Sequence, residues 1–488
     1  MENQEVSLED YFEKFRSNIV GDDYCFRSPF GKQRLLYADW IASGRLYAPI
    51  EDFIRDKIGP TFANTHSYSS ESGKISSRYY REARECIKKH VNANQDDILI
   101  TTGHGMTGAL SKLQRLMGLK TLPLRETGRE AQERPVVFIT HMEHHSNQVS
   151  WLQLGAEVVI VPPGEHLEVS PQELEKALLP YQDRRIKIGA FSACSNVTGI
   201  QTPYHELSKV MHRYSGVCIV DFAASAPYVE IDMHPDEDAF LDAIVFSPHK
   251  FLGGPGSCGI LVFNKRLYAA QSPDDPGGGN VRWTRPGGDF AYFKDIETVE
   301  DGGTPGILQV IRAALAIKLK EKMNPLHMKR REKELLNLCI KRLSAIPGLY
   351  LLGDQQSERI GCLSFGIEKV HYNLIVRLLN DRFGVQVRGG WSCASTYCHY
   401  LFNIDQQESA AIMASIENQD LTPKPGWVRV SLHPTLTDRE ARFTVRPWDQ
   451  FRRISKTGRR ITPTTKSLMN LTCYRKTSNS FSKKILPG

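Results

Sequence analysis

Short apolar segments alternate with amphipathic ones through the middle of this 488-residue chain, and this alternation constrains the fold more than any other feature. The apolar segments have the length of strands and are apolar on both sides, which is typical of strands covered on both faces. They are residues 98–101, 136–139, 157–161, 186–191, 217–220, 243–246 and 259–263, and the amphipathic segments between them include 108–116, 170–179 and 205–214. The pattern predicts an α/β fold with a large, mostly parallel, seven-stranded sheet between two layers of helices.

One strand of this sheet is expected to run against the others. Residues 259–263 follow residues 243–246 through a short connection that contains no helical pattern. Because a parallel connection requires a long crossover, the strand at 259–263 is predicted to be antiparallel.

The pattern of predicted secondary structure changes after Thr304-Pro305. A single long helical pattern runs from Leu308 to about Leu343, and strand-like residues 363–366 and 427–432 then flank a helix at 371–381. This order predicts a smaller α+β unit. We therefore expect four parts, namely an N-terminal segment (1–60) packed on the small domain, a large domain (61–318), a small domain (319–440) and a tail (441–488).

The tail accounts for the basic character of the chain. Residues 439–488 contain 13 Lys/Arg and 2 Asp/Glu, so the net charge of +7 for the whole chain hides an acidic balance of −4 before Arg439. Thr437 and Glu440 predict a helix start, yet Pro447, Gly458 and sparse apolar residues follow. We expect a divergent, misread or disordered terminus, and we expect no nucleic-acid binding by the body of the protein.

Cysteine usage and apolar runs indicate the compartment. The ten cysteines are scattered without a CxxC pair, which favours reduced thiols and gives no metal-ligand spacing. No apolar run approaches the roughly 18 residues that span a bilayer. The acidic N-terminus resembles neither a secretory signal nor a transit peptide, so a cytoplasmic protein without membrane contact is predicted.

Lys250 is the residue with the most specific chemistry. It lies directly after the buried run 243–246 and directly before the glycine-rich turn 253–256. A lysine in that position has limited access to water, so its pKa should be lowered. Such an amine is suited to a Schiff base with a carbonyl cofactor, and the alternative is a lysine that ends a strand at the surface.

Polar residues also follow other predicted strands. Asp221 comes after residues 217–220, where open α/β sheets place ligand sites, and a buried carboxylate there requires a cation. The glycines of residues 102–108 leave backbone N–H groups at a helix start, as a phosphate cradle or as a plain turn.

Two further motifs directly follow predicted strands. Residues 141–147 contain adjacent histidines, but no further Cys or His lies at ligand spacing, so an imidazole stacked on a cofactor ring is favoured over zinc. Asn196-Val197-Thr198-Gly199 offers an amide for a phenolic oxygen, or forms a turn.

Together these motifs resemble the class V aminotransferase family of pyridoxal-phosphate (PLP) enzymes, and within it the cysteine desulfurase and selenocysteine lyase branch. Four signatures occur in the order of the family, and the resemblance covers about residues 35–440. They are Glu143-His144-His145-Ser146-Asn147, Asn196-Val197-Thr198-Gly199, Ser247-Pro248-His249-Lys250 and Gly303-Thr304-Pro305. The resemblance implies the fold-type I PLP-dependent transferase fold.

The resemblance also implies roles around the cofactor. Lys250 would carry the Schiff base, Asp221 would keep the pyridine nitrogen protonated, His144 would stack on the ring, and Asn196 would contact its 3-oxygen. Gly105, Met106, Ser247 and His249 would hold the phosphate. Thr304 would reach the phosphate of the neighbouring subunit's cofactor, which implies a homodimer.

Substrate and sulfur roles follow from two further segments. Arg429 matches the arginine that binds the substrate α-carboxylate, for which a bidentate guanidinium is suited; a surface ion pair is the alternative. Arg388-Gly389-Gly390-Trp391-Ser392-Cys393-Ala394 keeps the pattern of the loop that carries the persulfide-forming cysteine. Cys393 would be the nucleophile, with Arg388 beside it favouring the thiolate and contacting substrate; the alternative is a buried structural cysteine, with Cys398 as a spare thiol.

The implied reaction is the conversion of L-cysteine to L-alanine with transfer of sulfur to Cys393 as a persulfide, for delivery to a sulfur acceptor protein. Two departures from the family leave other reactions open. Ala224 stands where the family usually has glutamine, and Trp391 stands where relatives have a small residue, cysteine or histidine. The alternatives are transamination, β-elimination or epimerisation of an amino acid, or a weakly active PLP-binding dimer that acts through partners.

Overall fold

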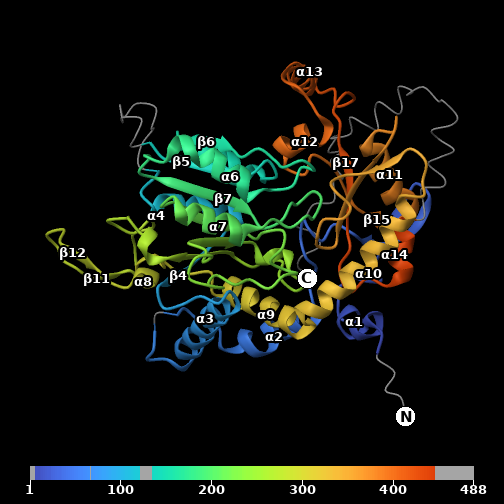
Figure 1. The fold of residues 1–488 in the computed structure, drawn as a ribbon. Coiled ribbons are helices and arrows are strands. Elements are labelled where there is room, and N and C mark those ends of the chain that lie inside the picture. The colour runs from blue at the N-terminus through green and yellow to red at the C-terminus, as the bar shows by residue number, and fades with distance from the viewer. Residues whose placement is uncertain (1–5, 66, 121–133, 446–488) are drawn as a thin grey trace, which may run out of the picture.

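The structure is a computed structural model that describes residues 6–65, 67–120 and 134–445 (Figure 1). Its centre is a seven-stranded sheet in the order β4-β10-β9-β8-β7-β5-β6. These strands are β4 (Asp97–Thr102), β5 (Val136–Ile139), β6 (Glu157–Ile160), β7 (Lys187–Ser192), β8 (Val217–Asp221), β9 (Ala243–Phe246) and β10 (Gly259–Asn264). All seven predicted strands are present, so the predicted α/β class and the large sheet are confirmed.

The antiparallel position of β10 is also confirmed. β10 pairs antiparallel with both β9 and β4, whereas β9, β8, β7, β5 and β6 are parallel to one another. The link from β9 to β10 contains only a single 3₁₀ turn at Pro248–Lys250, which is too short for a crossover.

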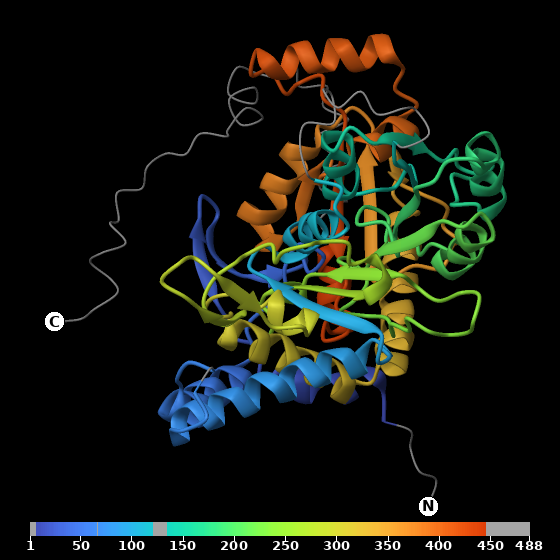
Figure 2. The ribbon, with the colours of Figure 1, turned by 90° about the vertical axis from the view of Figure 1, so that its left-hand side faces the viewer.

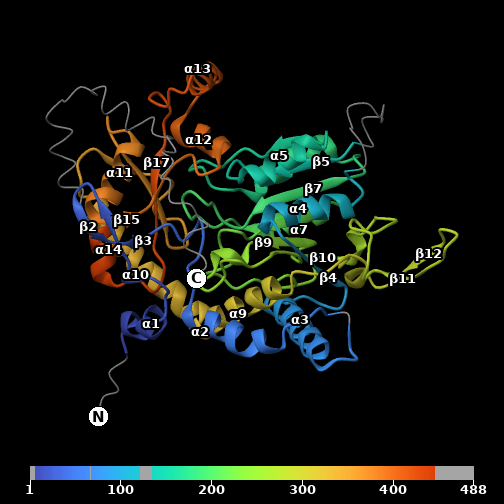
Figure 3. The same cartoon turned by 180° about the vertical axis from the view of Figure 1, so that it is seen from behind.

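Helices cover both faces of this sheet because successive side chains along each buried strand point to opposite sides. Leu99, Val136 and Phe138 face one layer, whereas Ile98, Val137 and Ile139 face the other. The first layer contains α3 (Glu71–His90), α6 (Pro171–Leu178), α7 (Tyr204–Arg213) and α9 (Ile307–Met323), and the second contains α4 (Gly105–Leu116) and α5 (His145–Gln153) (Figures 1 and 3). The helix predicted from Gly108 begins three residues earlier, at Gly105.

The prediction of one long helix over 308–343 is wrong. The structure has two helices, α9 and α10 (Pro325–Leu343), which are separated by Asn324. Asn324 has a left-handed φ of 64°, and its side chain accepts hydrogen bonds from Leu326 N and His327 N, so it caps the second helix. Pro325 cannot continue α9, but it suits the first turn of a new helix.

A four-stranded antiparallel sheet, β13-β14-β17-β16, forms the second core (Figure 2). Its strands are β13 (Leu349–Leu351), β14 (Cys362–Ile367), β17 (Trp427–Ser431) and β16 (Arg388–Gly390), and they pack with α10, α11 (Tyr372–Phe383) and α14 (Asp438–Thr444). This is the smaller α+β unit expected from the sequence. The domain boundaries drawn from the sequence remain predictions, and α10 is the element that connects the two cores.

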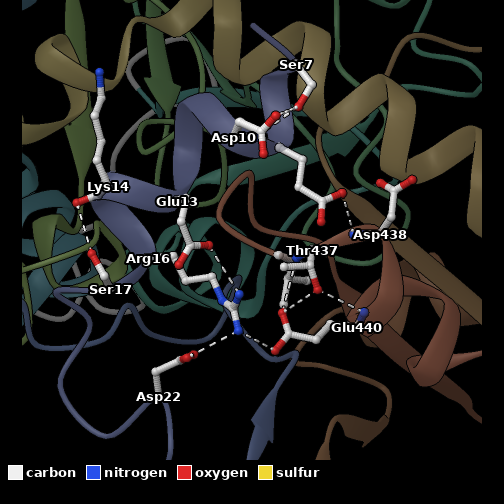
Figure 4. Close-up of polar contacts among 12 residues, drawn as sticks. Ser7, Asp10, Glu13, Lys14, Arg16, Ser17, Asp22, Thr437, Asp438 and Glu440 are labelled. Atoms are coloured by element: carbon white, nitrogen blue, oxygen red, sulfur yellow. Dashed lines mark hydrogen bonds and ion pairs between the residues drawn. The ribbon is translucent and has the colours of Figure 1, made fainter.

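The N-terminal residues contact both cores. β3 (Leu36–Tyr37) pairs with β15 (Val385–Gln386) of the smaller unit, whereas α2 (Ala48–Phe53) lies against α9. Arg16 of α1 (Leu8–Arg16) forms an ion pair of 3.0 Å with Glu440, and Thr437 forms a capping box with that glutamate (Figure 4). The predicted start of α14 is therefore confirmed, whereas the expectations for the tail beyond residue 445 lie outside the described residues.

The remaining elements lie outside the two main sheets. They are the hairpins β1 (Cys25–Ser28) with β2 (Gly31–Arg34) and β11 (Val281–Thr284) with β12 (Phe290–Tyr292), and the helices α8 (Ile296–Val299), α12 (Ser395–Phe402) and α13 (Gln406–Glu417). Figure 1 shows α13 at the top of the molecule, away from the N-terminal helix. None of the helices among the described residues is both long and apolar enough to cross a bilayer.

Candidate active site

A cavity of about 430 Å³ opens at the carboxyl ends of the parallel strands, where open α/β sheets bind ligands. It collects side chains that lie far apart in the sequence. The predicted site residues in its wall are Gly105, Met106, His144, Asn196, Asp221, Ser247, His249, Lys250, Arg388, Cys393 and Arg429. Of the residues predicted from the sequence, Thr304 is the one that this cavity does not include.

Lys250 lies in the 3₁₀ turn after β9, at the base of the cavity. Burial lowers the pKa of its amine, as the sequence predicts, while the charge of Asp221 opposes this shift. In the described part of the chain Lys250 has no carboxylate within salt-bridge distance. The amine is therefore poised to react as a nucleophile.

Asp221 ends β8, one strand away from β9. Its carboxylate is buried, and Oδ1 accepts a hydrogen bond of 2.7 Å from Ala223 N. Burial raises the pKa of Asp221 to about 7, and the nearby carboxylate of Glu143 adds to the effect. Burial disfavours the charged carboxylate, so a cation is needed to stabilise it, and a protonated pyridine nitrogen would supply one.

A buried hydrogen-bond network fixes His144. The preceding residue, Glu143, accepts hydrogen bonds from the Thr140 hydroxyl (2.7 Å), the Ser192 hydroxyl (2.6 Å) and Asn147 Nδ2 (2.7 Å). These bonds join the ends of β5 and β7 to the start of α5, where His144 is the N-cap. Burial, followed by the charge of Lys250, lowers the pKa of His144 to about 4, so its ring is neutral and suited to stacking.

The start of α4 fits a phosphate group. His104, the N-cap of α4, makes no side-chain capping hydrogen bond, and Gly105 has a φ of +60°. Met106 N donates to Ser247 Oγ at 2.8 Å, and a Cβ on Gly105 would lie 3.0 Å from the same oxygen. Only glycine leaves room for close approach of an anion to these N–H groups.

Two arginines face the cavity from neighbouring strands, because Arg388 of β16 pairs in register with Arg429 of β17. Arg429 is only 2% exposed; its Nη1 donates to Asn196 O at 2.8 Å, and its Nε has no hydrogen-bond partner among the described residues. Asp39 joins the two arginines, at 2.7 Å from Arg429 Nη2 and 3.2 Å from Arg388 Nε.

Cys393 lies on a loop of unusual backbone geometry. Ser392 and Cys393 have left-handed φ values of 48° and 59°, which L-residues adopt only under constraint. The constraint comes from the large domain: Asn196 Nδ2 donates to Ser392 O (2.6 Å) and His145 N donates to Cys393 O (2.8 Å). The Cys393 side chain is exposed at the cavity, so the alternative of a buried structural cysteine does not describe it.

Trp391 of this loop is half-buried and packs against the hydrophobic core of the large sheet. Its indole donates to Pro425 O at 2.6 Å, and Lys424 Nζ lies 4.6 Å from the ring centre. The large side chain therefore also contacts residues 424–425.

Thr304 lies outside the cavity of its own chain. It is exposed, and its hydroxyl accepts a hydrogen bond of 3.3 Å from Asn64. This position leaves the threonine accessible to a second subunit.

Several cavity residues were missed in the sequence reasoning. Ile41 and Ala42 come from the N-terminal segment, Cys194 precedes Asn196, and Thr107 bonds to Ser146 at 2.8 Å between α4 and α5. Thr107 and Ser146 lie inside motifs that the sequence singled out, whereas Ile41 and Ala42 carry no local signal. Among the described residues, no group of three or more His, Cys, Asp or Glu side chains is arranged to hold a metal ion.

The comparisons with known proteins agree with this geometry. The model of the family described as Aminotransferase class-V matches residues 37–441. A probable cysteine desulfurase of Halalkalibacterium halodurans is 28% identical over 371 residues, which cover 75% of this chain and 86% of the relative. One from Staphylococcus aureus is 26% identical over 393 residues, with 80% and 90% of the two chains covered.

Solved structures share the fold. A cysteine desulfurase from Thermococcus onnurineus, solved in its apo form, superposes with a TM-score of 0.72 at 19% identity, with 90% of this chain and 97% of the other covered. The cysteine desulfurase CsdA of Escherichia coli gives 0.69 at 22% identity, with 91% and 98% covered. These likenesses confirm the fold-type I PLP-dependent transferase fold.

Proposed function

Because the chain belongs to the class V aminotransferase family, we propose that it is a PLP-dependent enzyme of the cysteine desulfurase type. In this proposal L-cysteine and the thiol of Cys393 react to give L-alanine and a persulfide on Cys393. The observation that carries the proposal is the single cavity that contains Lys250, Asp221, the arginine pair and an exposed cysteine. The curated relatives named probable cysteine desulfurases support the same reaction.

PLP, when bound, supplies a carbonyl for covalent attachment and a ring that withdraws electrons from the α-carbon of an amino acid. Lys250 is the residue that holds the cofactor, and its lowered pKa favours the neutral amine that this attachment needs. Asp221 would keep a proton on the ring nitrogen, and the neutral imidazole of His144 would stack on the ring. The start of α4 with Ser247 and His249 would bind the phosphate, and Asn196 would contact the 3-oxygen; all of these residues line the cavity.

Arg429, Arg388 and Cys393 are the residues proposed to bind the substrate and to accept its sulfur. Arg429 and Arg388 bind its carboxylate and orient its side chain toward the Cys393 loop. The amine of Lys250 would also serve as the base that moves protons at the α-carbon and β-carbon of the substrate. Cys393 attacks the substrate sulfur: the carbon–sulfur bond breaks, a sulfur–sulfur bond forms, and the thiol proton is transferred to the alanine product.

The proposal includes an assembly and a compartment. The exposed Thr304 supports a homodimer in which this residue completes the phosphate site of the other subunit. The exposed Cys393 supports transfer of the persulfide sulfur to an acceptor protein. The nine cysteines in the described part of the chain are free thiols, which supports a reducing, cytoplasmic compartment.

A second candidate is a class V reaction on an amino acid in which Cys393 takes no part. The observation that favours it is Ala224, a nearly buried cavity residue that offers no hydrogen bond to the cofactor ring where the family usually has glutamine. Transamination, β-elimination and epimerisation all need Lys250 and Asp221 but no thiol.

The experiment that tests the proposal is product analysis with L-cysteine under reductant. We expect equal amounts of L-alanine and sulfide from the wild type, and a loss of about a hundredfold or more in both for Cys393→Ala. Cys398→Ala is the matched control, because this thiol lies five residues away but is buried in α12. Undiminished sulfide release by Cys393→Ala would refute the persulfide route and favour the second candidate.

A further inference from the structure

Asp39 makes contacts at the active site that no sequence motif indicates. Its carboxylate lies between the two substrate arginines, with Oδ1 at 2.7 Å from Arg429 Nη2 and Oδ2 at 3.2 Å from Arg388 Nε. The Asp39 side chain is 15% exposed, so water only partly screens these ion pairs. One negative charge is thereby shared between two positive charges.

The position of Asp39 is fixed by the fold. It follows β3, whose parallel pairing with β15 attaches this segment to the smaller unit. The Asp39 carbonyl accepts hydrogen bonds from Ala42 N (2.9 Å) and from the Tyr37 hydroxyl (3.2 Å). The backbone of Asp39 is therefore fixed, and its carboxylate lies beside the two arginines that line the cavity.

Asp39 also determines which donors remain for a ligand. On Arg429, Nη2 is bound by Asp39 and Nη1 by the carbonyl of Asn196, whereas Nε has no partner among the described residues. On Arg388, which is 47% exposed, Asp39 binds Nε on the inner side. The three side chains carry a net charge of +1, which matches one carboxylate.

We propose that Asp39 is a specificity-determining and positioning residue, which restricts the arginine pair to amino acids that carry a single carboxylate. Because Asp39 neutralises one of the two arginine charges, a second carboxylate on the substrate side chain would find no free positive charge at the arginine pair to compensate it. Cysteine and alanine meet this condition, whereas aspartate does not. The inference rests on the proposed function only in taking amino acids as the ligands of this cavity.

The test is calorimetric titration of the purified holoenzyme with L-alanine and with L-aspartate. We expect the wild type to bind alanine at least about tenfold more tightly than aspartate. Asp39→Asn keeps the size and one acceptor oxygen but removes the charge, and it should shift this ratio by about tenfold or more toward aspartate. Asp39→Glu keeps the charge and should keep the preference for alanine.

Asp22→Asn is the matched control, because Asp22 also joins two arginines, Arg16 at 3.4 Å and Arg34 at 3.0 Å, but neither of these arginines lines the cavity. This variant should leave the ratio unchanged. The bound-cofactor absorbance and thermal unfolding of each variant establish that it is folded.

Three results would overturn the inference. They are an unchanged ratio in Asp39→Asn, an equal weakening of both ligands, which indicates a structural role alone, and a wild type that binds neither amino acid. Failure of the sulfur-transfer proposal is separate, because it is read from products of L-cysteine and not from the ratio of these two affinities.

Discussion

The surroundings of Lys250 and of Cys393 are built in opposite ways, although both residues line one cavity. Lys250 follows a fully buried strand and has Asp221 on the neighbouring strand, so regular hydrogen-bonded structure fixes its position. Cys393 lies on a loop with two successive left-handed residues, and contacts from the large domain hold this loop in place. The end proposed to hold the cofactor is thus rigid, whereas the end proposed to accept sulfur is exposed and irregular.

This difference indicates a division of labour. Attachment of a cofactor needs fixed geometry and a desolvated amine, which strand ends provide. Transfer of sulfur to another protein needs a thiol that reaches the surface, which a loop provides. Substitutions around Lys250 should therefore affect cofactor binding, and substitutions around Cys393 should affect sulfur transfer while cofactor binding is retained.

The largest effect is expected at the rigid end. Lys250→Ala removes the only amine proposed to hold the cofactor, so the yellow colour of the holoenzyme and its bleaching by borohydride should be lost. Turnover of L-cysteine should fall by more than about a thousandfold. Absorbance spectra and alanine release measure these two quantities.

Lys424→Ala is the control at the loop end, because this lysine lies against Trp391 of the Cys393 loop. It should keep the cofactor colour and its sensitivity to borohydride. Retention of a borohydride-sensitive chromophore by Lys250→Ala would contradict the division between the two ends.

A smaller effect is expected in the pH dependence of the apoprotein. Burial raises the pKa of Asp221 from 3.8 to about 7, so folded Asp221 keeps a proton between these values that the unfolded chain releases. The free energy of unfolding should therefore fall as pH rises from about 4 to about 7, and the ionisation of this residue accounts for a decrease of the order of 4 kcal/mol. Below this window both states are protonated, and above it both are ionised.

Urea unfolding of the apoprotein at several pH values measures this contribution. In Asp221→Asn the decrease in unfolding free energy between about pH 4 and about pH 7 should be smaller by the contribution of Asp221. Cys393→Ser changes no buried charge, so its plot of unfolding free energy against pH should run parallel to that of the wild type. Parallel curves for Asp221→Asn and wild type would show that Asp221 is not the buried carboxylate described here.

The rigid end was also the more predictable from the sequence. Buried parallel strands produce unbroken apolar runs, so the residue that follows each run can be located, as for Asp221 and Lys250. The lowered pKa of Lys250 follows from the same pattern. The long-helix prediction failed because the helical periodicity continues through Asn324 and Pro325, and the capping side chain of Asn324 was not weighed.

Residues brought in by tertiary contacts were not predictable in this way. Asp39 is separated from Arg429 by 390 positions, and no periodicity or motif relates the two. The same holds for Ile41 and Ala42 in the cavity wall. The left-handed backbone of Ser392 and Cys393 depends on hydrogen bonds from the large domain, so the loop pattern alone could not indicate it.

The most direct test of the central claim is the mass of the Cys393 peptide after a single turnover with L-cysteine in the absence of reductant. The account predicts one additional sulfur atom on this peptide, one equivalent of L-alanine, and no added sulfur on the peptide of the Cys393→Ala variant. Formation of product in the wild type while Cys393 stays unmodified would contradict it.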